Sequence, residues 1–435
     1  MTMLSRVFTA LSCFLLAASV AAQDAPPTPA RPYRGLFGGA RPDPSRARLL
    51  DLRLSLTGGF DDNLATFAAG TVSDPRLQVR GGMASGEAAL AYQRGAREHD
   101  WFRAGARAGF RQYPSMASWN AAEFGGDIGF SRTLARRVIV RATQAVARQP
   151  FMRLEAVPGL AAGDLASFDH GIVKRDSLGY QATADARFEF GRKTFLTPKY
   201  TISGVEMLEG EDRGYQRGQS AGVTLTADRW RRASLGADYS YVTDENSYTG
   251  PLTIYRTHNL AASIAYRRTL RGQRQVTFAM RPGVALAEID TPSVRRYTER
   301  RPIAGATARV DFTRTWSWSV EYERGYHYLS GFGEPFFTDN ARTTLSGFFL
   351  RSVDLALAAG YSNGSVRYLE RGGYASVSGT ARVRVAVNRR LAFTGQYLYY
   401  SYEFGPGVVL PPGFGRNFDR MGVRLGVEVW LPMFR

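Results

Sequence analysis

Arginine recurs at every fourth position in one stretch of the chain, at Arg103, Arg107 and Arg111. In an extended strand, residues an even number apart lie on one face, so the three guanidinium groups are expected to form a row. The next stretch carries Glu123 and Asp127 at the same spacing. Such a row can attract anions or acidic sugars, and it can equally pair with the carboxylates across a hairpin. Both interpretations stay open.

Charged residues of both signs occupy the corresponding positions of other stretches, so that the surface they share is expected to be polar and nearly balanced in charge. Further basic residues assigned to this surface are Arg141, Arg187, Arg382 and Arg384. The four histidines stand in no recognisable catalytic motif, and the chain has no metal-ligand spacing, phosphate loop or nucleotide fingerprint. We therefore expect neither an enzyme nor a cofactor.

The elements that position these side chains are strands. Apolar residues alternate with polar ones, as in Leu178, Tyr180 and Ala182, which interleave with Gly179 and Gln181. The pattern recurs about eighteen times between residue 49 and residue 435. Because a closed barrel is the only strand-built structure that can cross a membrane, we predict an all-β fold, a transmembrane antiparallel up-and-down β-barrel of about 18 strands. The alternative is a soluble all-β protein.

Long and short connections are expected to alternate, which is typical of bacterial outer-membrane barrels with short turns in the periplasm and long loops outside. The predicted long connections are 60–79, 148–176, 207–215, 244–255, 288–301, 329–340, 363–372 and 403–418. The last strand is expected over 419–431, and Pro432 is expected to break it and reset the phase before Phe434.

The first residues resemble a secretory signal, with Arg6 before an apolar run over 7–20 and small residues before Gln23. We predict a signal peptide over 1–22 and a flexible periplasmic leader, rich in Pro, Ala and Gly, over 23–48. The only cysteine, Cys13, lies in the signal, so no disulfide is expected.

The longest predicted connection, 148–176, occupies the place of the third external loop. In general porins the third loop folds inward, and this one looks similar by position. Its carboxylates Glu155, Asp164 and Asp169 would then face arginines of the wall across a constriction. The alternative is an ordinary surface loop.

A short motif follows the first predicted strand: Gly59, Phe60, Asp61, Asp62 and Asn63. It resembles a motif early in the putative β-barrel porin group of outer-membrane proteins, some of which are associated with exopolysaccharide export. The alternative is a polar loop start. The resemblance implies an exit pore for a secreted polysaccharide that works with a periplasmic export protein. Inward aromatic residues on which sugar rings could stack are Trp101, Tyr113, Tyr374, Tyr400 and Trp430.

Two other functions remain open, a passive uptake porin for small solutes and a closed structural barrel whose loops bind partners. The net charge of +18 is concentrated in the predicted short turns, for example at Arg136, Arg137, Arg389 and Arg390. Such turns can contact anionic phospholipids or an acidic partner, or serve only solubility and topology. Export from the cytoplasm and the scattered arginines exclude nucleic acid as a partner. Outer-membrane lipid is the expected surrounding.

Overall fold

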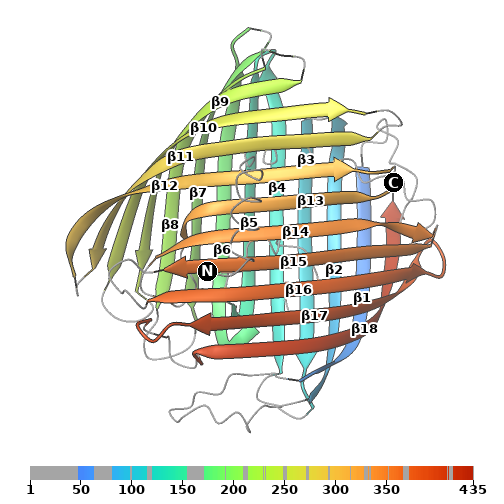
Figure 1. Cartoon of the computed structure of the whole chain (residues 1–435). Coiled ribbons are helices and arrows are strands. Elements are labelled where there is room, and N and C mark those ends of the chain that lie inside the picture. The colour runs from blue at the N-terminus through green and yellow to red at the C-terminus, as the bar shows by residue number, and fades with distance from the viewer. Residues whose placement is uncertain are drawn as a thin grey trace.

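The chain folds into a closed barrel of 18 antiparallel strands in the computed structural model (Figure 1). Each strand pairs with its neighbours in sequence, and the first pairs with the last. The strands are β1 (Arg48–Asp61), β2 (Gly81–Arg97), β3 (Asp100–Gln112), β4 (Ala121–Ala135), β5 (Val138–Arg153), β6 (Gly171–Glu189), β7 (Thr194–Met207), β8 (Tyr215–Ala227), β9 (Ala233–Asn246), β10 (Thr253–Thr269), β11 (Gln275–Thr291), β12 (Val294–Asp311), β13 (Ser317–His327), β14 (Phe336–Leu350), β15 (Val353–Ser365), β16 (Gly373–Ala386), β17 (Leu391–Phe404) and β18 (Asn417–Phe434).

The structure describes residues 48–62, 81–97, 100–114, 120–153, 171–191, 193–208, 214–228, 230, 232–247, 252–270, 274–291, 294–313, 315–327, 332, 335–350, 352–365, 372–408, 410 and 415–434. The predicted signal peptide and leader therefore lie outside the described residues, except for Arg48, which begins β1. No helix in the described part of the chain is long and apolar enough to span a membrane.

The predicted alternation sets which face of each strand points outward. Leu56 of β1 and Leu425 of β18 are 63% and 68% exposed, in the same phase as their leucine and valine neighbours. The opposite phase, with Glu87 and Glu428, lines a cavity shared by β1–β4 and β16–β18, which form one continuous arc because β1 pairs with β18. Since the apolar phase of these strands is exposed on the outside, the polar phase that lines the cavity faces the lumen. Apolar side chains on the outside of a closed barrel face lipid. The chain is a bacterial outer-membrane β-barrel, and the soluble alternative is excluded.

Most connections alternate in length as predicted, which defines two ends of the barrel; the exception at the long-loop end is the β11–β12 connection, which has only residues 292–293. At the short-turn end, only 136–137 separates β4 from β5 and 387–390 separates β16 from β17. At the long-loop end, residues 62–80 connect β1 to β2, and 405–416 connect β17 to β18. Both chain ends of the barrel, Arg48 and Phe434, lie at the short-turn end, which in barrels of this class is the periplasmic one.

Two predicted connections are wrong because strands extend into them. β11 runs to Thr291 and β12 begins at Val294, where a long connection over 288–301 was predicted. Likewise β5 ends at Arg153 and β6 begins at Gly171, inside the predicted loop 148–176. The outward positions of these strand ends are polar, for example Arg296 and Arg300. A strand that projects beyond the hydrocarbon layer needs no apolar face, so its sequence resembles a loop.

The last strand continues through Pro432 to Phe434, so the predicted break at this proline is wrong. Pro432 lies opposite Asp51 and Phe434 opposite Leu50, with a register shift between these two pairs. Because of this register shift, the backbone of Phe434 pairs with Leu50, a residue of the outward phase, and the strand continues.

Candidate functional site

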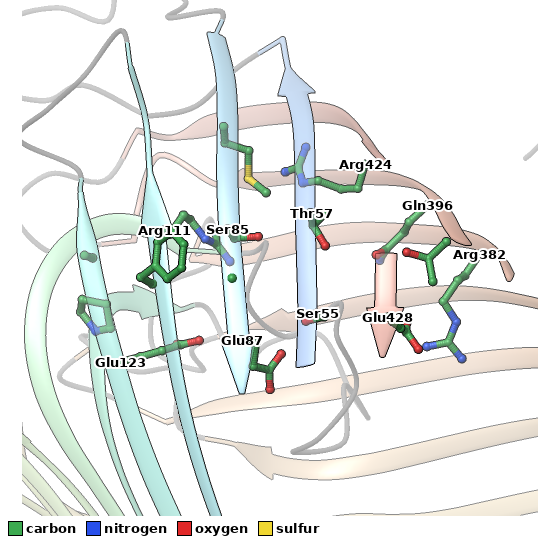
Figure 2. Close-up of a pocket in the computed structure, with 16 residues that line it drawn as sticks. Ser55, Thr57, Ser85, Glu87, Arg111, Glu123, Arg382, Gln396, Arg424 and Glu428 are labelled. Carbon is green, nitrogen blue, oxygen red and sulfur yellow. The ribbon is translucent and has the colours of Figure 1, made fainter. Parts of the chain in front are cut away.

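A polar wall lines one side of the lumen. Glu87, Arg111 and Glu123 project from β2, β3 and β4, and Arg382 and Glu428 project from β16 and β18 (Figure 2). Basic and acidic side chains alternate around this wall, with Ser55, Thr57 and Gln396 between them. A solute in contact with the wall meets hydrogen-bonding groups of both charges.

The predicted arginine row lies on β3, in the lumen-facing phase, and its partners are offset from the prediction. Arg103 lies opposite Gly129 and Arg107 opposite Gly125 on β4, while the two carboxylates Glu123 and Asp127 also lie opposite glycines. The glycines make room for the charged side chains that lie over them, since an added Cβ at Gly125 would come within 2.8 Å of Arg107 Nε. Arginines and carboxylates therefore interdigitate diagonally instead of facing each other directly.

Other predicted wall residues form direct ion pairs. Arg384 reaches Asp354 at 2.6 Å and Glu428 at 3.3 Å, which joins β15, β16 and β18. Arg141 lies 3.3 Å from Asp185 between β5 and β6.

Arg187 lies 3.9 Å from Glu189 and stacks on Phe195, with its guanidinium carbon 3.8 Å from the ring centroid. The charged wall is thus held by pairing, which the sequence offered as one of two interpretations. A role of these residues in selectivity stays a prediction.

The long-loop end of the β13–β14 hairpin leaves the barrel wall. The β12–β13 ladder ends at Ala304 opposite Arg324, although β12 extends ten residues further toward the long-loop end, to Val294. Beyond that point Tyr326 packs against Tyr255 of β10, with ring centroids 5.4 Å apart. Contact between β13 and β10, which are not neighbours in the barrel, shows that the hairpin bends away from the wall.

The direction of this bend is inward. Tyr255 belongs to the lumen-facing phase of β10, opposite to the exposed Leu260, whereas Tyr326 belongs to the phase of the lipid-side Trp318. An outward-phase residue of β13 can touch the inner face of β10 only if the hairpin end lies within the barrel. We call residues 325–327, Phe332 and residues 336–340 the inturned hairpin.

Phe332 occupies the outer mouth and is only 2% exposed. Its carbonyl oxygen accepts a hydrogen bond of 2.5 Å from Nδ2 of Asn246 on β9, and its ring stacks on Phe404 of β17 at 5.0 Å. Strands β9 and β17 lie on distant arcs of the barrel, because seven strands separate them on the shorter side. Phe332 thus contacts both arcs, β9 through its backbone carbonyl and β17 through its ring, and it narrows the mouth.

Sequence reasoning assigned the constriction to another loop. Glu155, Asp164 and Asp169 lie outside the described residues, so that prediction is untested. The inturned hairpin was missed, although the sequence holds a signal for it. Phe332, Phe336 and Phe337 fall in the predicted external loop 329–340, and aromatic residues in such a loop indicate a segment that packs inside.

The motif after the first strand closes the barrel. Asp61 is fully buried and accepts hydrogen bonds of 2.7 Å from Arg420 and Arg424 of β18, which are 2% exposed. Asp62 Oδ1 accepts a bond of 2.7 Å from the backbone N–H of Met421. We call Asp61, Arg420 and Arg424 the closing cluster, since it joins the first strand to the last.

The other motif residues surround this cluster. Gly59 lies opposite Arg424 on β18, where an added Cβ would come within 2.5 Å of the arginine Cδ, and Phe60 points outward and is exposed. Asn63 lies outside the described residues. The motif is therefore more than a polar loop start.

Four of the aromatic residues expected to stack on sugars are packed within the protein. Tyr113, Tyr374, Tyr400 and Trp430 are all buried, at 5% exposure or less. Tyr374, for example, packs edge-on against Phe336 of the inturned hairpin at 5.0 Å. Trp101 is the exception, and it is covered on one face by Arg103 at 5.1 Å. The expectation of an open aromatic track for sugar rings is wrong for these four side chains.

The described histidines are spread over different environments. His258 lies on the lipid side, where its Nδ1 is 2.9 Å from the hydroxyl of Tyr239 and its ring packs against Tyr241. His327 lies at the end of β13 beside the lumen. Within the described ranges, no group of three His, Cys, Asp or Glu side chains is placed to hold a metal ion.

No protein-family model and no curated protein matches the chain. Among solved structures, it is similar to OpdL of Pseudomonas aeruginosa, with a TM-score of 0.45 and 12% identity over 89% of this chain and 99% of that one. It is similar to OccAB4 of Acinetobacter baumannii at a TM-score of 0.45 and 9% identity, over 90% of this chain and all (100%) of the other. The ferric-catecholate import receptor Fiu of E. coli gives a TM-score of 0.42 and 9% identity, over 87% and 81% of the two chains. Similarity at this level carries no argument about function, which has to come from the wall and the inturned hairpin.

Proposed function

We propose that the chain is a selective channel through which small polar solutes diffuse across the outer membrane. This is the uptake-porin alternative of the sequence analysis. The observation that carries it is the position of Phe332, which narrows the outer mouth of a barrel that has a polar wall along one side of its lumen.

The width of the barrel supports passage of a solute. Barrels of sixteen to eighteen strands leave an aqueous lumen. The polar wall with Glu87, Arg111 and Arg382 lies on β2, β3 and β16. The inturned hairpin lies against the inner face of β9 and β10. The hairpin also reaches β17 and β16 through Phe332 and Phe336, so a solute that passes the narrowed mouth next meets the polar wall.

The narrowed mouth favours small solutes over a polymer. An exporter for polysaccharide would need an open track of sugar-binding surfaces through the lumen. Tyr374, Tyr400 and Trp430 are instead buried, and Asp61 of the motif that suggested export is used to close the barrel. The hypothesis of polysaccharide export is therefore supported only by the resemblance of the motif.

Single-channel recording of the refolded protein in planar bilayers tests the proposal. The wild type should show small, steady openings, and Phe332→Ala should raise the conductance because it removes a ring from the outer mouth. Sugar-driven swelling of proteoliposomes should show a matching increase in the largest sugar admitted. Phe393→Ala is the matched control, since Phe393 is a lipid-facing phenylalanine on β17 and should leave both measurements unchanged.

Deletion of 155–169 is the competing experiment, and it spares the strand residues that end at Arg153 and resume at Gly171. An increase in conductance on this deletion, with none in Phe332→Ala, would move the constriction to the loop predicted from the sequence. Passage of long dextrans through the wild type would contradict a small-solute channel and support export.

A further inference from the structure

The short-turn end of the barrel carries a ring of exposed cations. Nine basic side chains are exposed in or beside its turns: Arg132, Arg136, Arg137, Lys193, Arg232, Arg268, Arg274, Arg389 and Arg390. They come from the turns after β4, β6, β8, β10 and β16, and therefore from widely separated arcs of the barrel. We call these residues the basic rim.

The basic rim has little compensation from carboxylates. None of its nine side chains forms an ion pair within the part of the chain that the structure describes. Two nearby carboxylates are engaged elsewhere: Asp100 accepts from the backbone N–H of Thr133, and Glu189 pairs with Arg187. The rim therefore presents a positive field to its surroundings.

Exposed apolar side chains stand in the same turns as these cations. They are Leu134, Phe190, Trp230, Leu270 and Val387, one for each of the five turns. Aromatic and aliphatic side chains at this level mark the boundary between hydrocarbon and head groups, which they enter from the edge of the barrel. Each cation is thus held at the depth where lipid phosphates lie.

We propose that the basic rim binds the phosphate groups of anionic phospholipids in the inner leaflet of the outer membrane. The distribution of the cations favours lipid over an acidic periplasmic protein. A protein partner would need one contiguous patch, whereas these cations follow the perimeter and each group is paired with apolar side chains that face the membrane. The inference rests on the fold and is independent of the channel proposal.

Native mass spectrometry of the detergent-solubilised full-length protein tests it, with phosphatidylglycerol and phosphatidylcholine as the lipids added. Phosphatidylglycerol should bind more tightly than phosphatidylcholine. The variant Arg136→Gln/Arg137→Gln/Arg389→Gln/Arg390→Gln should lose at least about tenfold in affinity for phosphatidylglycerol, because each basic residue near an anionic surface contributes a factor of about five.

The matched control removes four outward arginines from the long-loop end, at Arg217, Arg256, Arg296 and Arg300, and so changes the net charge equally. It should retain wild-type affinity for phosphatidylglycerol. For every variant, the shift of the folded band on unheated gels verifies the barrel.

An equal loss of phosphatidylglycerol affinity in both quadruple variants would mean that only the net charge matters, and this would overturn the proposal. Equal binding of the two lipids by the wild type would also overturn it. Tighter binding of polyglutamate than of phosphatidylglycerol to the wild type, lost in the rim variant, would assign the rim to an acidic partner instead.

Discussion

At the scale of single residues, the closing cluster is the most buried set of charges in the described structure. Asp61 is the shared acceptor of two arginines. Asp61→Asn keeps an oxygen acceptor but removes the negative charge. The guanidinium groups of Arg420 and Arg424 then stay buried without the carboxylate that balances their charge. Breaking a buried ion pair on one side destabilises by about 3–5 kcal/mol. Urea titration of the refolded protein in vesicles should show a loss of this size in the free energy of unfolding.

Asp62→Asn is the control for that substitution. The Asp62 carboxylate is less buried and accepts one bond, from the backbone of Met421, which an amide oxygen can also accept. The loss should stay below about 1 kcal/mol. Equal losses in the two variants would show that the buried charge of Asp61 contributes nothing beyond a hydrogen-bond acceptor.

The sequence predicted the orientation of the wall residues but not their partners. A period of two assigns Arg103, Arg107 and Glu123 to one face regardless of where the hairpin turns, and the structure places them there. Partners depend on register, which the length and geometry of the connecting loop determine. The glycines opposite each charge carried the missing information, because a long side chain lies most easily over a position without a Cβ.

At the scale of elements, docking of the inturned hairpin depends on Phe337. Its ring lies under the guanidinium of Arg301 of β12 at 4.8 Å, and within the hairpin it packs against Tyr326 at 5.0 Å, the residue that contacts Tyr255 of β10. Phe337→Ala should weaken docking by about 3 kcal/mol, the scale of a buried phenylalanine truncation. Bilayer recordings should then show frequent transitions to a larger conductance, because the hairpin leaves the mouth part of the time.

The contrast with Phe332→Ala separates two effects of the hairpin. Loss of Phe332 removes bulk and should raise conductance steadily, whereas loss of Phe337 removes an attachment and should add fluctuations. A quiet trace of wild-type amplitude from Phe337→Ala would show that the hairpin is held by its other contacts, such as that of Tyr326 with Tyr255.

The sequence predicted where the strands occur, but it did not predict how long they are. The alternation is strong where one face meets lipid, as in β1, and there the predicted and observed strands agree within a few residues. It fades where strands project beyond the membrane, as over 294–301 of β12. The inturned hairpin also escaped prediction, because its displacement is a tertiary effect that places outward-phase side chains inside.

At the scale of the whole molecule, the net charge of +18 is distributed unevenly. Inside the barrel, arginines and carboxylates nearly balance, as the pairs of Arg141 with Asp185 and of Arg384 with Asp354 illustrate. The exposed cations of the basic rim have no such partners among the residues that the structure describes. The positive excess therefore acts on the membrane and not on solutes in the lumen.

This distribution predicts weak ion selectivity in spite of the strongly basic sequence. In a gradient of potassium chloride across a planar bilayer, the wild type should give a reversal potential close to zero. Glu87→Gln removes one negative charge from the polar wall, so the reversal potential should move toward that of chloride. Glu206→Gln is the control, because Glu206 lies on the outward phase of β7 and pairs with Arg217 at 2.8 Å. A strong anion preference in the wild type, unaffected by Glu87→Gln, would mean that the basic rim and not the wall sets selectivity, because the rim is the remaining source of positive field at the entrance.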